Sequence, residues 1–288
     1  MSKRNLLNIL LLIFTLALVA VIIFEPGKEK AFIPPTLTQL NADDIQTIKI
    51  SRASIKTNES ELLFRKTANK WQLIKPYQIP ANTFRVDSIL KLLSAVSLSQ
   101  NTLNNLDLNK FGLDTPLATI TFNDTSIIFG HNKSLKNHRY VKIDSTLHMI
   151  ADTFYYQLIA KIESYIDHKL LPENSKIIKL LLPGIKLEQI NGIWQSTPEA
   201  DDFSADAVTQ LIDEWQLSQA FDIEKIHPQP DSKADIMIYL HDKSISRFKI
   251  KPDQDSFTLI NIDSGISYII AKDRRNKLLH LSGIEQND

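Results

Sequence analysis

Histidine side chains near carboxylates or serines are the first candidates for chemistry in this chain. His131 and His138 flank a short loop that contains lysines, Arg139 follows directly, and His148 lies nine residues further on. Imidazole nitrogens bind zinc and exchange protons near neutral pH, so such a group has two candidate chemistries. However, six residues between His131 and His138 is not a recognised spacing for metal ligands. We interpret these histidines as solvated loop residues and expect neither a bound metal nor a cofactor.

A serine–lysine pair is the second candidate. Ser88 and Lys91 match the S-x-x-K pattern of penicillin-recognising enzymes, and the segment 99–101 is similar to their S-x-N. The third element, K-T-G, does not follow either of them, and S-x-x-K arises often by chance. We interpret Ser88 as part of the solvent-facing edge of a helix and expect no enzymatic activity. A metal-independent hydrolase stays an alternative, which requires a Ser/His/Asp or paired-carboxylate cluster that spacing alone does not reveal.

Composition excludes several larger classes of chemistry. The 288-residue chain has 7 glycines, none closer than eight positions to the next, and no cysteine. Phosphate-binding loops and nucleophile elbows need paired glycines, and thiol catalysis, zinc–thiolate sites and disulfides need cysteine. The 33 lysines and arginines balance 33 aspartates and glutamates, a neutrality that is not typical of nucleic-acid-binding proteins. We therefore expect a folded protein without a nucleic-acid partner.

Two tryptophans and a basic stretch are the candidates for ligand binding. Trp71 and Trp194 follow predicted hairpin turns, where they either pack in a core or form a stacking platform for a glycan. The basic stretches 133–139 and 272–277 are either solvated loops or contacts for anionic lipid or polymer. The candidate surface for a ligand or partner therefore consists of the two tryptophans and three basic residues: Trp71, Trp194, His131, His138 and Arg139.

The N-terminus predicts a membrane anchor. Residues 6–24 are apolar apart from Asn8 and Thr15, and a helix of this length is close to the thickness of the hydrocarbon core. Lys3 and Arg4 in the tail 1–5 favour a cytoplasmic N-terminus, which places the rest of the chain outside a bacterial inner membrane. A cleaved signal peptide and a buried core helix are the alternatives. The proline-containing segment 25–42 then forms a short stalk.

The remainder of the chain contains an internal repeat. Segments 84–100 and 203–219 share Phe, Asp, Leu and a closing Leu-Ser-Gln at identical spacing, which gives an offset of 119 residues. Two tryptophan-containing segments upstream and Ile-Asp-Ser segments downstream recur in the same order. We therefore predict two tandem modules, at 43–171 and 176–284.

Each module has the same predicted elements. Hydrophobic alternation indicates strands at 45–50, 61–66, 71–75, 118–122, 126–129, 139–143 and 147–150, and at 177–182, 236–240, 245–250, 257–262 and 268–271. Val86, Ile89, Leu90, Leu93 and Val96 lie at helical spacing on one face. A second helix is predicted near 153–165. The fold class is α+β, with antiparallel sheets each packed against a helix.

Several motifs resemble those of a known family. Lys70-Trp71-Gln72-Leu73 with Pro76, a helix, Phe111-Gly112-Leu113-Asp114-Thr115-Pro116, Phe129-Gly130 and Tyr140-Val141 follow one another between residues 60 and 152. This pattern is similar to an uncharacterised bacterial envelope family known only as a domain of unknown function. The resemblance implies one N-terminal span, and some members are encoded beside ABC-transporter subunits of the gliding-motility type. Ile166 replaces the arginine common in the family's aromatic-Arg-Asp motif, and the second module lacks the G-L-D-x-P turn.

Sequence and resemblance together favour a membrane-anchored interaction or scaffolding protein in the periplasm. Its expected partners are the membrane and an envelope protein, for instance ABC-transporter subunits, as the resemblance implies. A module that binds cell wall or polysaccharide is the first alternative, and the hydrolase is the second.

Overall fold

The computed structural model describes residues 3–24, 35–104, 106–133, 137–199, 203–226, 232–251 and 257–281. Residues 25–34 of the expected stalk and residues 134–136 of the first basic stretch lie outside the described residues. The chain divides into two units, residues 1–35 and 36–288.

The first unit consists of the helix α1 (Lys3–Phe24). This helix is long and apolar enough to cross a membrane, and none of its most apolar window is buried by protein. Leucine, isoleucine and phenylalanine side chains are exposed all around it. An apolar helix without a protein environment matches the span predicted at residues 6–24, and a signal sequence has the same properties.

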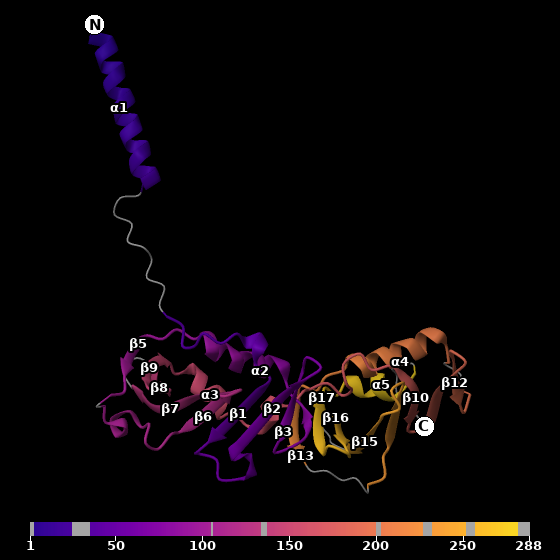
Figure 1. The fold of residues 1–288 in the computed structure, drawn as a ribbon. Helices are drawn as coiled ribbons and strands as arrows, with labels where there is room; N and C mark the ends of the chain where they lie inside the picture. Colours follow the sequence, from indigo (N-terminus) through magenta and orange to yellow (C-terminus); the bar gives the residue numbers. More distant parts are fainter. Residues whose placement is uncertain are drawn as a thin grey trace. The chain divides into compact units, whose positions relative to one another are not determined.

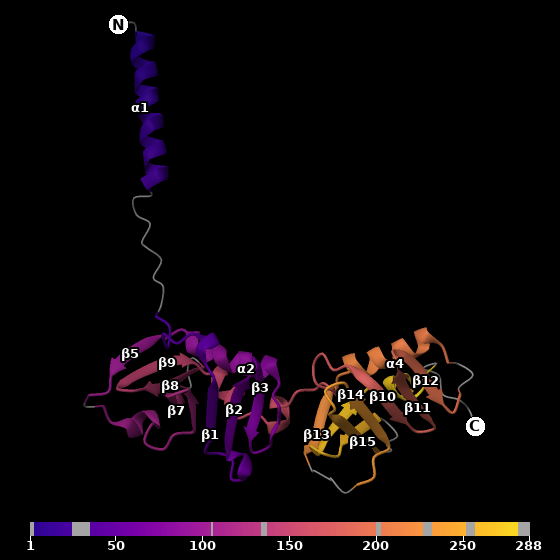
Figure 2. The same ribbon diagram turned by 45° about the vertical axis from the view of Figure 1, so that its right-hand side comes forward.

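The second unit contains two antiparallel sheets, which are visible as separate groups of strands in Figures 1 and 2. In spatial order the first sheet consists of β4 (Ile79–Pro80), β3 (Lys70–Lys75), β2 (Glu61–Thr67), β1 (Thr47–Arg52), β6 (Ala118–Phe122), β7 (Thr125–Lys133), β8 (His138–Ile143), β9 (Thr146–Ala151) and β5 (Ser99–Thr102). The second consists of β12 (Ile193–Thr197), β11 (Ile185–Ile190), β10 (Ile177–Leu182), β14 (Ile236–Leu240), β15 (Ile245–Lys251), β16 (Phe257–Asn261), β17 (Ile266–Ile270) and β13 (Asp222–Ile226).

The two sheets have the same strand order once β4 is left out. Each begins with a three-stranded meander, inserts a helix, and then places its last strands in sequence beside the first strand. The fold is therefore α+β with two antiparallel sheets, as the strand pattern predicts. We call the part built on the first sheet, residues 36–165, the first lobe, and the part built on the second sheet, residues 171–281, the second lobe.

Each sheet is covered by the helix inserted after its meander. The first lobe has α2 (Thr83–Leu90), which tightens into a 3-10 turn η3 (Lys91–Ser94), and the second has α4 (Ala205–Leu217). A shorter helix follows the last strand of each sheet: α3 (Thr153–Leu158), with the 3-10 turn η5 (Ile162–Tyr165), and α5 (Arg274–Leu279). The second predicted helix of the first lobe is therefore present as two short pieces. Three further 3-10 turns are η1 (Ala42–Asp44), η2 (Asn58–Ser60) and η4 (Leu108–Phe111).

The helix caps correct the predicted register between the lobes. The side-chain oxygens of Asn82 and Ser204 each accept a hydrogen bond from the backbone three residues on, so these N-cap residues are equivalent at an offset of 122. Val86 and Val208 are both buried at the same offset. The sequence match at 119 is therefore wrong for the helices. A shift of three residues is nearly one helical turn, which leaves an apolar pattern on almost the same face.

The predicted apolar face of the first helix ends earlier than expected. Val86, Ile89, Leu90 and Leu93 are buried, whereas Val96 is 44% exposed. The helix tightens after Leu90, and the backbone is extended from Ala95 onward, so Val96 lies beyond the helical face.

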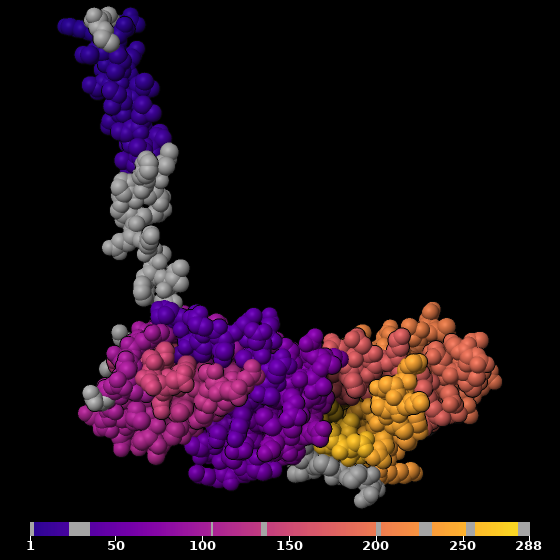
Figure 3. Space-filling model, in the orientation of Figure 1, coloured from indigo at the N-terminus to yellow at the C-terminus, as the bar shows by residue number. Residues whose placement is uncertain are grey.

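A short linker, residues 166–170, joins the lobes by backbone hydrogen bonds on both sides. Asp167 N–H donates to the Pro80 carbonyl at 3.0 Å, beside the edge strand of the first sheet. Ala220 N–H donates to the His168 carbonyl at 2.9 Å, ahead of the edge strand of the second. Figure 3 shows the two lobes in contact along this boundary. Buried apolar side chains of both lobes form one continuous core cluster, so the second unit is a single body.

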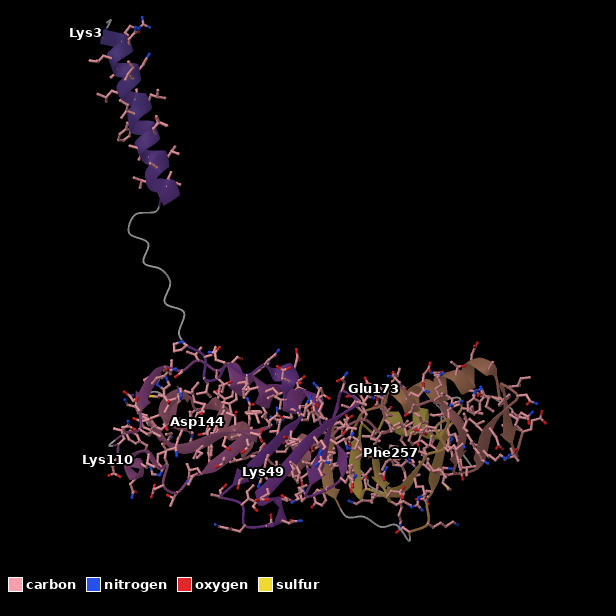
Figure 4. The ribbon with its side chains drawn as sticks, in the orientation of Figure 1. Lys3, Lys49, Lys110, Asp144, Glu173 and Phe257 are labelled. Carbon is pink, nitrogen blue, oxygen red and sulfur yellow. The ribbon has the colours of Figure 1, made fainter. Side chains whose placement is uncertain are left out.

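Ion pairs also connect the two lobes and the linker. Glu173 accepts from Lys70 of β3 at 3.6 Å and from Lys169 of the linker at 3.3 Å. Figure 4 labels Glu173 between the two sheets. The side chains of Lys70 and Glu173 are 52% and 53% exposed and that of Lys169 is 32% exposed, so these pairs contribute little to stability.

Candidate functional site

The F-G-L-D-x-P turn packs onto strand β7, and this contact accounts for two of the glycines. Gly112 has a φ of +65°, and a Cβ atom placed on it would lie 2.3 Å from the ring of His131. A Cβ atom on Gly130 would lie 2.1 Å from the carbonyl oxygen of Phe111. The Phe111 and Tyr140 rings meet edge to face, with centroids 4.9 Å apart. The motif residues therefore form a structural contact in which His131 packs beside a glycine.

Arg139 lies inside the first lobe. Only 4% of its surface is exposed, and its guanidinium forms an ion pair with Asp152 at the start of α3. Another of its nitrogens donates to the Gly130 carbonyl at 2.6 Å, and the group lies 3.8 Å from the centre of the Tyr155 ring. A buried pair with these additional contacts holds β7, β8 and α3 together. Contrary to the expectation from the sequence, Arg139 does not belong to an exposed ligand surface.

The two loop histidines differ in their surroundings. His131 is exposed, whereas His138 is half-buried, and its Nδ1 atom has no hydrogen-bond partner among the described residues. No group of three histidine, aspartate or glutamate side chains in the described part of the chain is arranged to hold a metal ion.

The third histidine of this region is buried, which the sequence interpretation missed. His148 lies on β9 with its Nδ1 atom 3.0 Å from the hydroxyl of Ser97, which is also buried. The Ser97 hydroxyl also donates to the Ser99 carbonyl at 3.2 Å. Burial lowers the pKa of His148. A hydrolytic serine needs access to substrate, which the buried Ser97 lacks, so this pair does not support the hydrolase alternative.

The serine of the S-x-x-K pattern, Ser88, forms a hydrogen bond within its own helix. The Ser88 hydroxyl donates to the Phe84 carbonyl one turn earlier, at 2.8 Å. Lys91 lines a shallow hollow of about 380 Å³ beside Trp71. A solvent-facing helix edge, as interpreted from the sequence, fits both observations.

The two tryptophans occupy the same place in the two sheets with different surroundings. Each is the second residue of the third meander strand, paired with Lys66 in the first lobe and with Gln189 in the second. Trp71 is 5% exposed and belongs to the core, whereas Trp194 is half-buried and packs against the core from outside. The burial of Trp71 leaves Trp194 as the one partly exposed member of the pair, which weakens the case for a glycan-stacking platform.

The second lobe has a groove that the sequence does not reveal. It lies between α4, the segment after it and the end of β17, and its volume is about 780 Å³. Leu217 and Phe221 line it with 76% and 65% of their surfaces exposed. Both are large apolar side chains that line one groove and stay exposed to solvent.

Acidic side chains form the wall of this groove. Asp206 and Asp213 lie two turns apart on the exposed side of α4. Glu214 forms an ion pair with Arg274 of α5, which is the single cation among the described residues that line the groove. The groove therefore combines an apolar pair with a net negative wall.

The first lobe has exposed side chains at the equivalent positions, but smaller or less exposed ones. The Ala95 and Ser218 carbonyls accept the same hydrogen bond, from Leu37 and Leu170, so the offset at this end of the helix is 123, and Leu217 corresponds to Ser94 and Phe221 to Leu98. Leu98 is 47% exposed, against 65% for Phe221. The second lobe therefore presents two large apolar side chains where the first presents one. The sequence match at 119 hides this difference, because that match pairs Leu217 with Leu98.

A second hollow of about 670 Å³ lies where the lobes meet. Its lining carries both signs of charge, with Arg85 and Lys161 on the first lobe and Asp222 and Glu224 on the second. His168 of the linker donates from Nδ1 to the Ala220 carbonyl at 2.9 Å, because a carbonyl only accepts. Side chains of both charges and a hydrogen bond from the linker meet in this hollow. We therefore interpret it as part of the contact between the lobes.

The described residues form an α+β protein with two antiparallel sheets and one apolar N-terminal helix. The chain belongs to the family described as Domain of unknown function (DUF4340), which matches residues 71–265, more than half of the sequence. This confirms the expected membership of a family without an assigned function. Comparisons with curated proteins and with solved structures found no match.

Proposed function

We propose that this protein is a membrane-anchored, extracytoplasmic interaction and scaffolding protein without chemistry of its own, an accessory component of an ABC-type transporter or another envelope assembly. The observation that carries the proposal is the exposed pair Leu217 and Phe221, which lies in a groove of the second lobe. A soluble lobe gains no stability from two solvated apolar side chains, so their place in a groove favours a protein partner. The transporter link rests on the resemblance to family members encoded beside such subunits.

The anchoring part of the proposal rests on α1. Its apolar side chains are exposed on all sides, and a bilayer is the environment in which such a helix is stable. Lys3 and Arg4 precede the apolar stretch, which favours retention of the N-terminus in the cytoplasm of a bacterium and an extracytoplasmic location for both lobes.

We further propose that the two lobes are tandem copies of one module. Their strand order is the same, and each is entered by a leucine that makes the same hydrogen bond. Leu37 N–H donates to the Ala95 carbonyl, and Leu170 N–H donates to the Ser218 carbonyl, in each case to the first residue after the helix or its 3-10 extension. Duplication supplies two similar bodies, of which one is free to change its surface.

The test is chemical crosslinking of the tagged full-length protein in native membranes, followed by identification of the proteins that co-purify. We expect a reproducible envelope partner, and we expect it to be absent when residues 1–35 are fused to an unrelated soluble protein, which isolates the contribution of the membrane span. Recovery of the protein alone contradicts the proposed function. Retention on purified cell wall without any protein partner favours the polysaccharide-binding alternative.

A further inference from the structure

The groove of the second lobe has an apolar end and an acidic wall. Leu217 ends α4, and Phe221 follows the short segment after it, so both side chains lie at the same end of the groove. Burial of side chains of this size by a partner is favourable, because it removes their apolar surface from water. This end of the groove is therefore suited to bind an apolar anchor residue of a partner.

The charge of the groove lining limits which kinds of partner bind there. Asp206, Asp213 and Glu214 give the lining three carboxylates, against the single guanidinium of Arg274. Anionic phospholipid headgroups are repelled by such a wall. A second copy that docks by the same groove is also disfavoured, because the contact of a surface with itself brings like charges together. A segment with lysine or arginine beside its anchor complements the wall.

The length of the groove limits the size of the segment. Asp206 and Leu217 are eleven residues apart on α4, which corresponds to about 16 Å along a helix axis. About five extended residues or three helical turns span this distance. The occupant is therefore a short segment and not a whole domain face.

We propose that this groove binds a short segment of a partner protein in which an apolar anchor residue, seated on Leu217 and Phe221, is flanked by lysine or arginine facing Asp206 and Asp213. The inference rests on the proposed function, since it names the kind of partner that the anchored protein binds.

The experiment places a photo-crosslinking amino acid, p-benzoylphenylalanine, in the full-length chain in living cells. The probe replaces Gln210 in the groove. As the matched control, it replaces Lys249 on the exposed side of β15. We expect a protein adduct at 210 and none at 249. Mass spectrometry of the crosslinked peptide is expected to show an apolar residue with neighbouring lysine or arginine.

Variants in the background of the 210 probe test the two features separately. Leu217→Ser with Phe221→Ser is expected to lower the adduct yield about tenfold or more, because both anchor contacts are lost. Asp213→Lys is expected to lower it about threefold to tenfold, whereas Asp124→Lys, a charge reversal on an exposed turn of the first lobe, leaves it unchanged.

The outcomes separate this inference from the function on which it rests. An adduct with lipid, with a second copy or with an acidic segment overturns the inference, as does a yield that Asp213→Lys does not change. If native-membrane crosslinking finds a partner but position 210 does not reach it, the proposed function stands and the groove is not its site. If neither experiment finds a partner, both fail.

Discussion

The two lobes differ in where their acidic and basic side chains lie. Among the described residues, every buried aspartate, glutamate, histidine, lysine or arginine lies in the first lobe: Arg52, Arg139, His148 and Asp152. The buried polar residues of the second lobe are uncharged: Ser218, Thr258 and Ser267. Its ion pairs, such as Arg247–Asp263 and Arg274–Glu214, are partly or largely exposed. The same strand order therefore supports two different distributions of charge.

This difference concerns how each lobe is held together. The first lobe uses buried polar contacts to fix its strands and helices, as when the guanidinium of Arg52 donates to the carbonyls of Glu59 and Ala160. Such contacts specify one arrangement, because each broken bond leaves a buried group unsatisfied. In the second lobe the acidic and basic side chains form ion pairs at the surface instead.

Removing the buried carboxylate is the strongest test of this comparison. Asp152→Ala leaves the Arg139 guanidinium buried without its counter-ion, and we expect the free energy of unfolding to fall by about 3–5 kcal/mol. Asp263→Ala breaks the exposed pair with Arg247 in the second lobe and is expected to cost less than about 1 kcal/mol. Urea denaturation of the full chain in detergent, followed by circular dichroism, measures both. Equal losses for the two variants contradict the comparison.

The tryptophans give a second, somewhat smaller contrast. Trp71→Ala removes a side chain that is 5% exposed and is expected to cost about 3 kcal/mol of unfolding free energy. Trp194→Ala removes an equivalent but half-buried side chain, so we expect about half that loss. The same denaturation experiment measures both variants. A larger loss for Trp194→Ala than for Trp71→Ala would sink the assignment of Trp71 to the core.

Most strands could be predicted from the sequence because their burial follows a period of two. The predicted ranges 118–122 and 236–240 coincide with β6 and β14, where buried and half-buried positions alternate. β5 was missed because its residues, Ser-Gln-Asn-Thr, have no apolar member and pair with β9 through backbone bonds alone. A strand held in this way leaves no hydrophobic signal in the sequence.

The groove could not be predicted, because its lining comes from segments that are far apart in the sequence. Glu214 and Leu217 are ordinary residues for the end of an amphipathic helix, and only the fold brings them together with Ile270 and Arg274 in one lining. His148 was misjudged for a related reason. Its neighbours identify a strand, but which face of the strand is buried depends on the helix that covers it.

The buried histidine predicts a pH dependence that belongs to the first lobe. Burial lowers the pKa of His148 in the folded state, whereas the unfolded value is about 6.5. Between these two pH values the unfolded state binds more protons than the folded state. The contribution of His148 to the free energy of unfolding is therefore complete above pH about 6.5. It decreases as the pH falls below that value, by at most about 1.4 kcal/mol per pH unit. Denaturation between pH about 5 and 7.5 measures this slope. His148→Asn is expected to flatten it, and an unchanged slope in that variant refutes the assignment.

The smallest expected effect concerns the groove and is also the most useful control. Leu217→Ser with Phe221→Ser changes two side chains that are mostly exposed, so we expect the free energy of unfolding to change by less than about 0.5 kcal/mol. The strands and helices around them are held by other contacts, among them the buried Trp215, whose indole nitrogen donates to the Leu278 carbonyl at 2.9 Å. Thermal and urea denaturation of the full chain in detergent measure the change. A loss above about 2 kcal/mol would mean that the pair stabilises the second lobe itself, and a lower crosslinking yield of this variant would then report unfolding and not a lost partner.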